Sequence, residues 1–224
     1  MSKSTILRGA LLAATLALAS APALAVKPFS ANYQANYMGM AANGRMSLEP
    51  AGEGRWKYTL QVTNKMGNLV QSTVFEEVDG QLRPLSGSDT SSVLIKRKKK
   101  QANYDWGKGV ATWSGDVKAD RAGPIKLQAG DLDALLVNLA VARDAAAGKP
   151  LRYRMVDDGR VRQLTYTVAG KEAVTVGGKS QQATKVVGAS GDKQTTLWVV
   201  PGMPVPVRIM QKDGDDVIEL RIAG

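Results

Sequence analysis

Residues 56–63 read WKYTLQVT, and this stretch decides the fold because its side chains alternate strictly between apolar and polar. Trp56, Tyr58, Leu60 and Val62 are apolar, and the residues between them are Lys, Thr, Gln and Thr. Successive side chains of a β-strand point to opposite faces, so a period of two predicts an antiparallel strand with one buried face. The same alternation recurs at residues 31–37, 163–168 and 218–222.

Short turn sequences separate these alternating stretches. Pairs of Asn, Asp and Gly favour the left-handed backbone of two-residue hairpin turns. Such pairs occur at Asn43-Gly44, Asp79-Gly80, Asp158-Gly159, Gly177-Gly178 and Asp213-Gly214. Roughly a dozen short strands joined by tight turns form an antiparallel meander that must curl to protect its edges. The expected fold class is therefore mainly β, with a strongly curved antiparallel sheet or an open barrel.

One segment has helical spacing instead. Four leucines fall on a single stripe of a helix, namely Leu132, Leu135, Leu136 and Leu139. This stripe predicts one helix over about residues 132–147 that packs against the sheet. Asp131 stands at the expected N-cap, Asp133 adds negative charge to the first turn, and Gly148 favours a stop. No Pro- and Ser-rich linker divides the chain, so residues 26–224 are expected to form a single β-rich domain.

Residues 1–25 have the features of a cleavable signal peptide. They run from a positive start through a short apolar stretch to a small-x-small cleavage site, formed by Lys3 and Arg8, residues 10–19, and Ala23-Leu24-Ala25. Cleavage after Ala25 would leave Val26 as the first residue. A bacterial lipid anchor requires a Cys at that point, and the sequence contains none. We therefore expect a soluble periplasmic protein.

The chain has no His and no Cys. This excludes Ser-His-Asp and Cys-His catalytic triads, thiol redox chemistry and the usual zinc sites, and no cofactor or metal is expected. The chain has 30 Lys and Arg against 20 Asp and Glu, and loss of Lys3 and Arg8 would leave 28 against 20. This positive charge favours anionic surfaces, while export argues against a nucleic-acid partner. The oligomeric state is left open.

Five consecutive cations form the most unusual local feature: Lys96, Arg97, Lys98, Lys99 and Lys100. In a strand they would place charge on both faces, which a half-buried strand does not normally accept. One interpretation is an exposed edge strand or a long hairpin, where lysines discourage edge-to-edge pairing. The alternative is contact with an anionic membrane surface or another polyanion of the envelope.

Seven aromatic side chains fall nearly all on the apolar faces of the expected strands: Tyr33, Tyr37, Trp56, Tyr58, Tyr104, Trp106 and Tyr166. In a barrel these faces share one interior. The aromatic side chains are expected either to pack the core or to line a cavity that holds a ligand.

Acidic side chains also occur in pairs, which could serve as acid and base in glycoside cleavage. No pair is convincing as a catalytic site, and the Asp pairs have simpler explanations, because Asp158 and Asp213 belong to expected turns and Asp131 to a helix cap. Ser190 and Lys193 match a Ser-x-x-Lys nucleophile only in spacing. We therefore assign no catalytic residue from the sequence.

Three segments resemble a known family when they are taken in order. Tyr104-Asp105-Trp106 closes a strand, Asp131 opens a helix, and residues 197–201 (LWVVP) precede residues 204–209 (PVPVRI). In this order they resemble an exported proteobacterial family, domain of unknown function 3108, over essentially the whole mature chain. The resemblance implies an envelope protein of mainly antiparallel β structure with no established activity. A lipocalin-like or lipoprotein-carrier-like half-barrel is the corresponding analogy of fold.

Three functions are compatible with these expectations. The first is a non-enzymatic periplasmic carrier that holds an apolar or amphipathic envelope ligand, such as a lipid, in the curved sheet. The second is an envelope assembly or structural factor that acts by protein–protein contact through an exposed sheet edge. The third is a carboxylate-based hydrolase that acts on envelope polysaccharide.

Overall fold

The structure is a computed structural model that describes residues 26–37 and 40–223. The expected signal peptide, including Ala25, lies outside these residues, and Val26 is the first residue described. The strands are β1 (Phe29–Tyr37), β2 (Met40–Pro50), β3 (Arg55–Asn64), β4 (Gly67–Val78), β5 (Gln81–Val93), β6 (Lys96–Asp105), β7 (Val110–Gly115), β8 (Ile125–Lys126), β9 (Arg152–Asp157), β10 (Arg160–Val176), β11 (Lys179–Ser190), β12 (Lys193–Val199), β13 (Arg208–Asp213) and β14 (Asp216–Ile222). The helices are a short 3₁₀ helix, η1 (Ala119–Arg121), and α1 (Ala134–Ala146).

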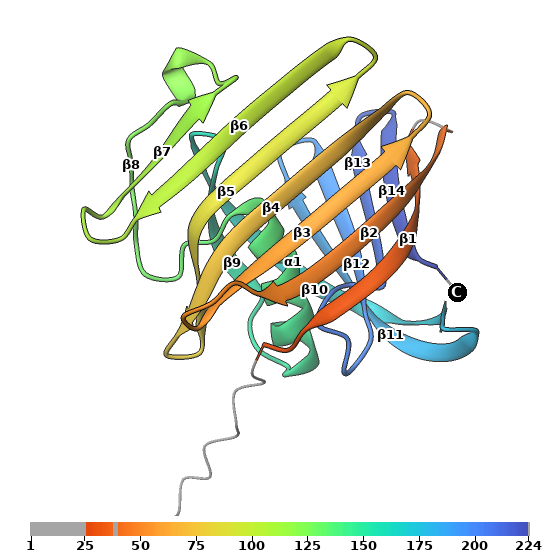
Figure 1. Cartoon of the computed structure of the whole chain (residues 1–224). Helices are drawn as coiled ribbons and strands as arrows, with labels where there is room; N and C mark the ends of the chain where they lie inside the picture. Colours follow the sequence, from red (N-terminus) through yellow and green to blue (C-terminus); the bar gives the residue numbers. More distant parts are fainter. Residues whose placement is uncertain (1–25, 38–39, 224) are drawn as a thin grey trace, which may run out of the picture.

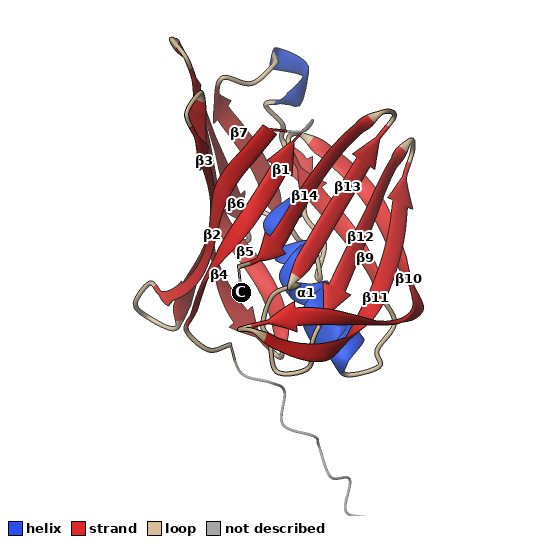
Figure 2. Cartoon of the chain, turned by 90° about the vertical axis from the view of Figure 1, so that its right-hand side faces the viewer, coloured by secondary structure: helices blue, strands red, loops and turns tan. Residues whose placement is uncertain are grey.

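All fourteen strands form one antiparallel sheet in the order β8-β7-β6-β5-β4-β3-β2-β1-β14-β13-β12-β11-β10-β9. The sheet consists of two meanders, β1 to β8 and β9 to β14, joined where β1 pairs with β14 from Tyr33 opposite Ile222 to Tyr37 opposite Ile218. It curls into a nearly closed barrel, as Figures 1 and 2 show. The expected fold class, mainly β with a strongly curved sheet or open barrel, is confirmed.

Three of the five expected turns are confirmed. Asp79-Gly80, Asp158-Gly159 and Gly177-Gly178 each join two strands, and both residues of every pair have positive φ. The turn predicted at Asn43-Gly44 is wrong, because both residues lie within β2 and pair with β1 and β3.

Gly44 instead permits a close approach between strands, since a Cβ atom there would lie 3.0 Å from the Cβ of Tyr33. The last turn falls one residue later than predicted. Asp213 pairs with Asp216, which leaves Gly214 and Asp215 as the turn residues.

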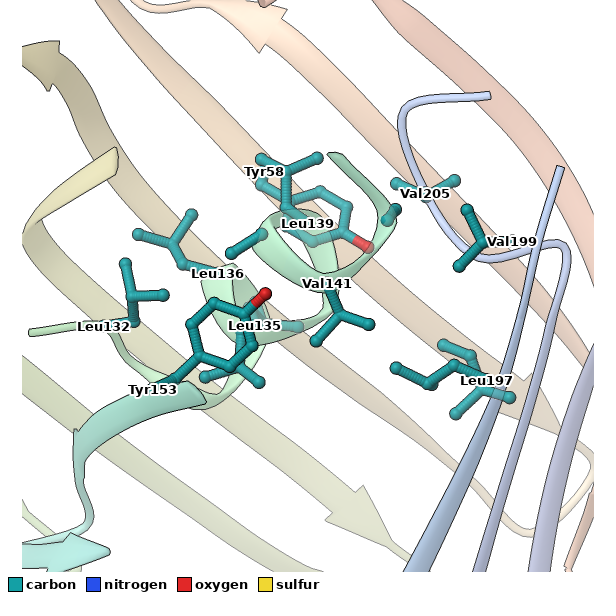
Figure 3. Packing of buried hydrophobic residues seen from close by; sticks show 14 of the residues in the cluster. Tyr58, Leu132, Leu135, Leu136, Leu139, Val141, Tyr153, Leu197, Val199 and Val205 are labelled. Carbon is teal, nitrogen blue, oxygen red and sulfur yellow. The ribbon is translucent and has the colours of Figure 1, made fainter. Parts of the chain in front are cut away.

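Helix α1 lies inside the curved sheet and contacts strands of both meanders. Its buried leucines and valines form the main core together with side chains of the surrounding strands, including Tyr58, Tyr153, Leu197 and Val199, and with Val205 of the β12–β13 connection (Figure 3). The packing expected for the leucine stripe is therefore present. No helix in residues 26–37 or 40–223 is long and apolar enough to cross a membrane.

The start of the helix differs from the prediction. Leu132 has extended backbone and bridges Met155 of β9, so the helix begins only at Ala134. Asp133 is the N-cap, and its Oδ1 accepts a hydrogen bond from the Leu136 N–H at 2.8 Å. Asp131 is not the cap, because its Oδ2 instead accepts bonds from the Gln128 N–H and from Arg154.

The two ends of the sheet, β8 and β9, meet at a seam that side chains bridge. The Tyr104 hydroxyl donates to the Val156 carbonyl at 2.9 Å, and both groups are buried in a second apolar cluster with Trp113. Asp158, beyond the end of β9, pairs with Lys100 at 3.1 Å and with Arg121 at 2.8 Å. Hydrogen bonds and ion pairs made by side chains, together with this apolar cluster, therefore hold the seam where no continuous strand ladder does.

The seam can be tested with Tyr104→Phe, which keeps the ring and removes the hydroxyl. Loss of one buried hydrogen bond should lower the free energy of unfolding by about 1–2 kcal/mol, measured by urea denaturation. Tyr166→Phe is the matched control, because no protein group bonds the Tyr166 hydroxyl among the described residues, and it should change stability by less than about 0.5 kcal/mol. Equal stability of the two variants would contradict this account of the seam.

Candidate functional site

A cavity of about 830 Å³ occupies the end of the barrel that α1 does not fill. Strands of both meanders form its wall, β1 to β5 and β9 to β14, and the N-terminal end of α1 closes its inner end. Its mouth lies beside the turns that join β3 to β4, β5 to β6, β11 to β12 and β13 to β14. The volume falls within the range of about 300–1,000 Å³ that is typical of small-molecule sites.

Burial changes along single strands where the barrel passes from filled to hollow. On β3, Tyr58 is fully buried against the core, whereas Leu60 and Val62 on the same face are half-buried and line the cavity. On β4, Phe75 is fully buried, whereas Gln71 is half-buried and lines the cavity. The same inward face therefore serves as core at one end of the barrel and as cavity wall at the other.

The wall is mainly apolar, and its polar groups lie mostly toward the mouth. Its apolar side chains include Leu60, Val62, Leu135, Met155, Leu164, Ile209 and Leu220. Amide, hydroxyl and amino groups come from residues near the turns, including Asn64, Asn68, Ser91 and Lys193. A ligand with an apolar body and a polar end would match this distribution.

Tyr166 is the only predicted aromatic residue that the described cavity wall contains. Its ring rests on β11 because residue 188 is glycine, and a Cβ atom there would lie 2.5 Å from the ring. Small residues in the wall, such as Ala35 and Ala42, leave further space.

The other predicted aromatic residues lie elsewhere. Tyr33 and Tyr58 are buried in the main core, where their hydroxyls bond the Pro206 carbonyl at 3.0 Å and the Met46 sulfur at 3.3 Å. Trp56 packs against the same core. Tyr104 and Trp106 belong to the cluster at the seam. These five residues belong to or pack against apolar clusters, and none of them lines the cavity of about 830 Å³. The side chain of Tyr37 lies outside the described residues.

The run of cations lies on a long hairpin formed by β5 and β6. Pairing of β6 with β7 begins only at Lys100, so Lys96, Arg97, Lys98 and Lys99 lie beyond the end of that ladder with exposed side chains. Lys100 differs, because it is half-buried and pairs with Asp89 at 3.4 Å as well as with Asp158. Partial burial alone would lower the pKa of Lys100, but these carboxylates raise it.

Asp133 and Asp157 bring two acidic groups together at the junction of helix and cavity. Burial, followed by the negative charge of Asp157, raises the pKa of Asp133 to about 7, although hydrogen bonds from Thr73 and the Leu136 N–H favour its charged form. Burial likewise raises the pKa of Asp157, which lines the cavity. Sequence reasoning missed this pair, because the two residues are distant in the chain and only the fold brings them together.

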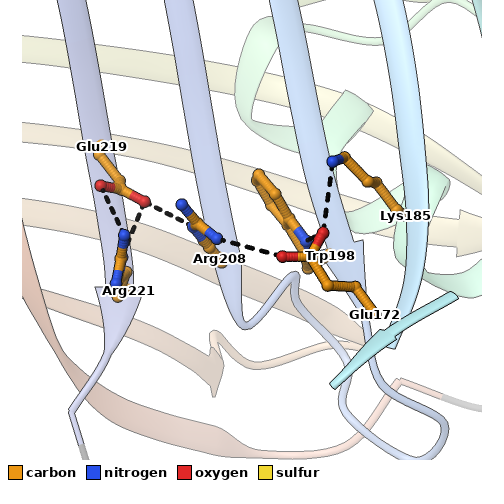
Figure 4. Close-up of polar contacts among 6 residues, drawn as sticks. All are labelled: Glu172, Lys185, Trp198, Arg208, Glu219 and Arg221. Carbon is orange, nitrogen blue, oxygen red and sulfur yellow. Dashed lines mark hydrogen bonds and ion pairs between the residues drawn. The ribbon is translucent and has the colours of Figure 1, made fainter. Parts of the chain in front are cut away.

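A third polar cluster lies on the outside of the barrel (Figure 4). Trp198 donates its Nε1–H to Glu172 at 3.0 Å, and the Arg208 guanidinium lies 4.1 Å from the centre of its ring. The hydrogen bonds from Trp198 and Lys185 lower the pKa of Glu172. The Leu197-Trp198-Val199 segment therefore contributes Leu197 and Val199 to the core and Trp198 to an outer apolar cluster, away from the cavity.

Comparison with known families matches residues 31–221 to a family described as "Protein of unknown function (DUF3108)". No curated protein and no solved structure matches the chain.

The raised pKa of Asp133 predicts that stability depends on pH. A carboxyl whose pKa rises from 3.8 to about 7 on folding favours the folded state at low pH, and this contribution is lost as pH rises toward and through 7. Asp133→Asn keeps a capping oxygen and removes the charge. Between pH 4 and pH 8, wild-type protein should lose on the order of 4 kcal/mol more unfolding free energy than the variant, measured by urea denaturation. Parallel pH profiles would contradict a buried titrating Asp133.

Proposed function

This chain belongs to the DUF3108 family, and we propose that it is a soluble, non-enzymatic periplasmic carrier that holds an apolar or amphipathic envelope ligand in the barrel cavity. One observation carries the proposal: a cavity of about 830 Å³ with a mainly apolar wall opens beside the turns at one end of the barrel. The export signal predicted from residues 1–25 supports the periplasmic part of the proposal.

Apolar contact would supply most of the binding energy. Each Å² of apolar surface removed from water contributes about 25 cal/mol of binding free energy. A ligand that covers Leu60, Val62 and Leu164 would therefore gain binding energy from apolar side chains on strands of both meanders. The wall is also built from many strands of one sheet, so the binding space exists before the ligand enters. A preformed site avoids part of the ordering cost of binding.

The position of the polar groups suggests how the ligand lies. Asn64, Ser91 and Lys193 stand near the mouth, whereas Leu135 lies at the closed end. An amphipathic molecule would place its apolar chain toward α1 and its polar end toward the turns. This arrangement lets the polar end keep hydrogen bonds while the chain leaves water.

The same geometry argues against the other two functions considered. The backbone of Leu132 bonds Arg154 and Val156 along the free side of β9, so β9 is not an open edge for a partner strand. The acids Asp133 and Asp157 could suggest hydrolysis, but both oxygens of Asp133 accept hydrogen bonds that start the helix and join it to β4. These contacts favour a structural role for Asp133.

The carrier function can be tested with a pair of adjacent tryptophan substitutions. Val62→Trp places a large side chain in the cavity, whereas Gln61→Trp adds the same side chain on the exposed outer face of β3. Wild-type protein and Gln61→Trp should bind the apolar dye N-phenyl-1-naphthylamine alike, and Val62→Trp should bind it at least about 10-fold more weakly.

Binding is measured by fluorescence titration of the dye, with thermal unfolding as a check that both variants fold. The cavity has room for the new ring, so the melting temperature of Val62→Trp should stay close to that of Gln61→Trp. Equal dye affinity in both variants, or no binding by the wild type, would overturn the proposed function.

A further inference from the structure

Exposed apolar side chains gather at one end of the barrel. Among the described residues, the large apolar side chains that are exposed are Met40, Met66, Val93, Leu94, Ile95, Val161, Val168, Val217 and Ile218. Most of them lie in or near turns at the mouth of the cavity, namely Met40, Met66, Val93, Leu94, Ile95, Val217 and Ile218. A random scatter of surface hydrophobic residues would not favour one end, so this distribution calls for a specific explanation.

The tip of the β5–β6 hairpin is the most exposed part of this end. Leu94 is 77% exposed and Ile95 is 97% exposed. The Leu94 N–H donates to the Met66 carbonyl at 3.0 Å, which fixes the hairpin tip beside the β3–β4 turn. Met66 is itself 47% exposed, so the two turns present one apolar projection to solvent.

Four cations come directly after Ile95 in the sequence. The side chains of Lys96, Arg97, Lys98 and Lys99 are exposed, and none of them forms an ion pair with any residue in the described part of the chain. Protection of a strand edge would account for the lysines. It would not account for the exposure of Leu94 and Ile95 next to them. Apolar side chains beside unpaired cations are the combination that binds the interface of an anionic bilayer.

We propose that the β5–β6 tip docks on an anionic phospholipid bilayer. Leu94 and Ile95 enter the boundary between headgroups and acyl chains, and the four cations contact lipid phosphates. The turns on the other side of the mouth and the residues next to them carry four acids against two lysines: Asp192, Asp213, Asp215 and Asp216 against Lys193, which pairs with Asp213 at 3.7 Å, and Lys212. This side is therefore net negative, and an anionic surface repels it. The molecule therefore rests on the β3 to β6 side of its mouth with these acids turned away.

Docking in this orientation brings the cavity mouth to the lipid. Met66 and Val93 belong to the apolar projection and also line the cavity, so they connect the bilayer surface with the cavity wall. An apolar chain could pass between the two along apolar side chains. This inference extends the proposed carrier function by naming the surface with which the carrier exchanges its ligand.

Binding to vesicles tests the proposal with two variants. Wild-type protein should sediment with vesicles of phosphatidylethanolamine and phosphatidylglycerol and much less with vesicles of phosphatidylcholine alone. Two changes should each weaken sedimentation roughly 10-fold or more: the double substitution Leu94→Ser with Ile95→Ser, and the replacement of all four cations by Gln. Four exposed lysines away from the mouth, Lys126, Lys149, Lys171 and Lys179, are replaced by Gln as the charge-matched control, which should bind much more tightly than the variant at the tip.

A fluorescent label tests insertion directly, because the chain has no native Cys. Ile95→Cys carrying an environment-sensitive fluorophore should shift to shorter wavelength on the anionic vesicles, and Val168→Cys with the same label should not. Equal sedimentation of the tip and control variants, or no spectral shift at residue 95, would overturn the proposal. A spectral shift that occurs without vesicles and grows with protein concentration would also overturn the proposal, because it would show that the tip contacts a second copy of the chain.

The two proposals fail separately. Dye binding in the tip variants should match the wild type, because Leu94, Ile95 and the four cations do not line the cavity. Loss of vesicle binding with normal dye binding therefore leaves the carrier function intact. If the wild-type protein does not bind the dye, the proposed carrier function is overturned. Vesicle binding still tests the docking surface in that case.

Discussion

The length of α1 relative to the strands around it is the constraint on which the rest of the structure depends. A helix of 13 residues rises about 20 Å, whereas β4 and β5, with 12 and 13 residues, extend about 40 Å along their own directions. One helix therefore fills only part of the barrel. Tyr58 and Phe75 are packed tightly where the helix lies, and Leu60 and Gln71 border open space where it does not.

Two local features fix where the helix starts and thus where the cavity ends. Leu132 is held in extended backbone by its bridge to Met155, and Asp133 caps the helix that follows. Thr73 of β4 bonds the same Asp133 carboxylate, which ties the helix start to the opposite meander. The cap therefore serves both the helix and the floor of the cavity, and its burial explains why its pKa rises.

The sequence predicted the strands and their inward faces well, because alternation at residues 56–63 is a local property of the chain. It did not predict the position of a residue along the barrel axis: Tyr58 and Leu60 have the same pattern, yet only Leu60 lines the cavity. The alternation of the aromatic residues likewise shows that they face inward but not at which height in the barrel. Of those whose side chains are described, only Tyr166 lines the cavity. Asn43-Gly44 shows the limit of a turn signal, because pairing with β1 and β3 outweighed the local preference. Asp133 and Asp157 come together only through tertiary packing.

The central claim is that the space above α1 holds a ligand. Native mass spectrometry of protein purified from its own cell envelope without detergent tests this claim most directly, followed by mass spectrometry of an organic extract of the same sample. The account predicts a complex heavier than the bare chain and an amphipathic lipid in the extract in stoichiometric amount. A bare chain with no extractable apolar molecule would contradict it.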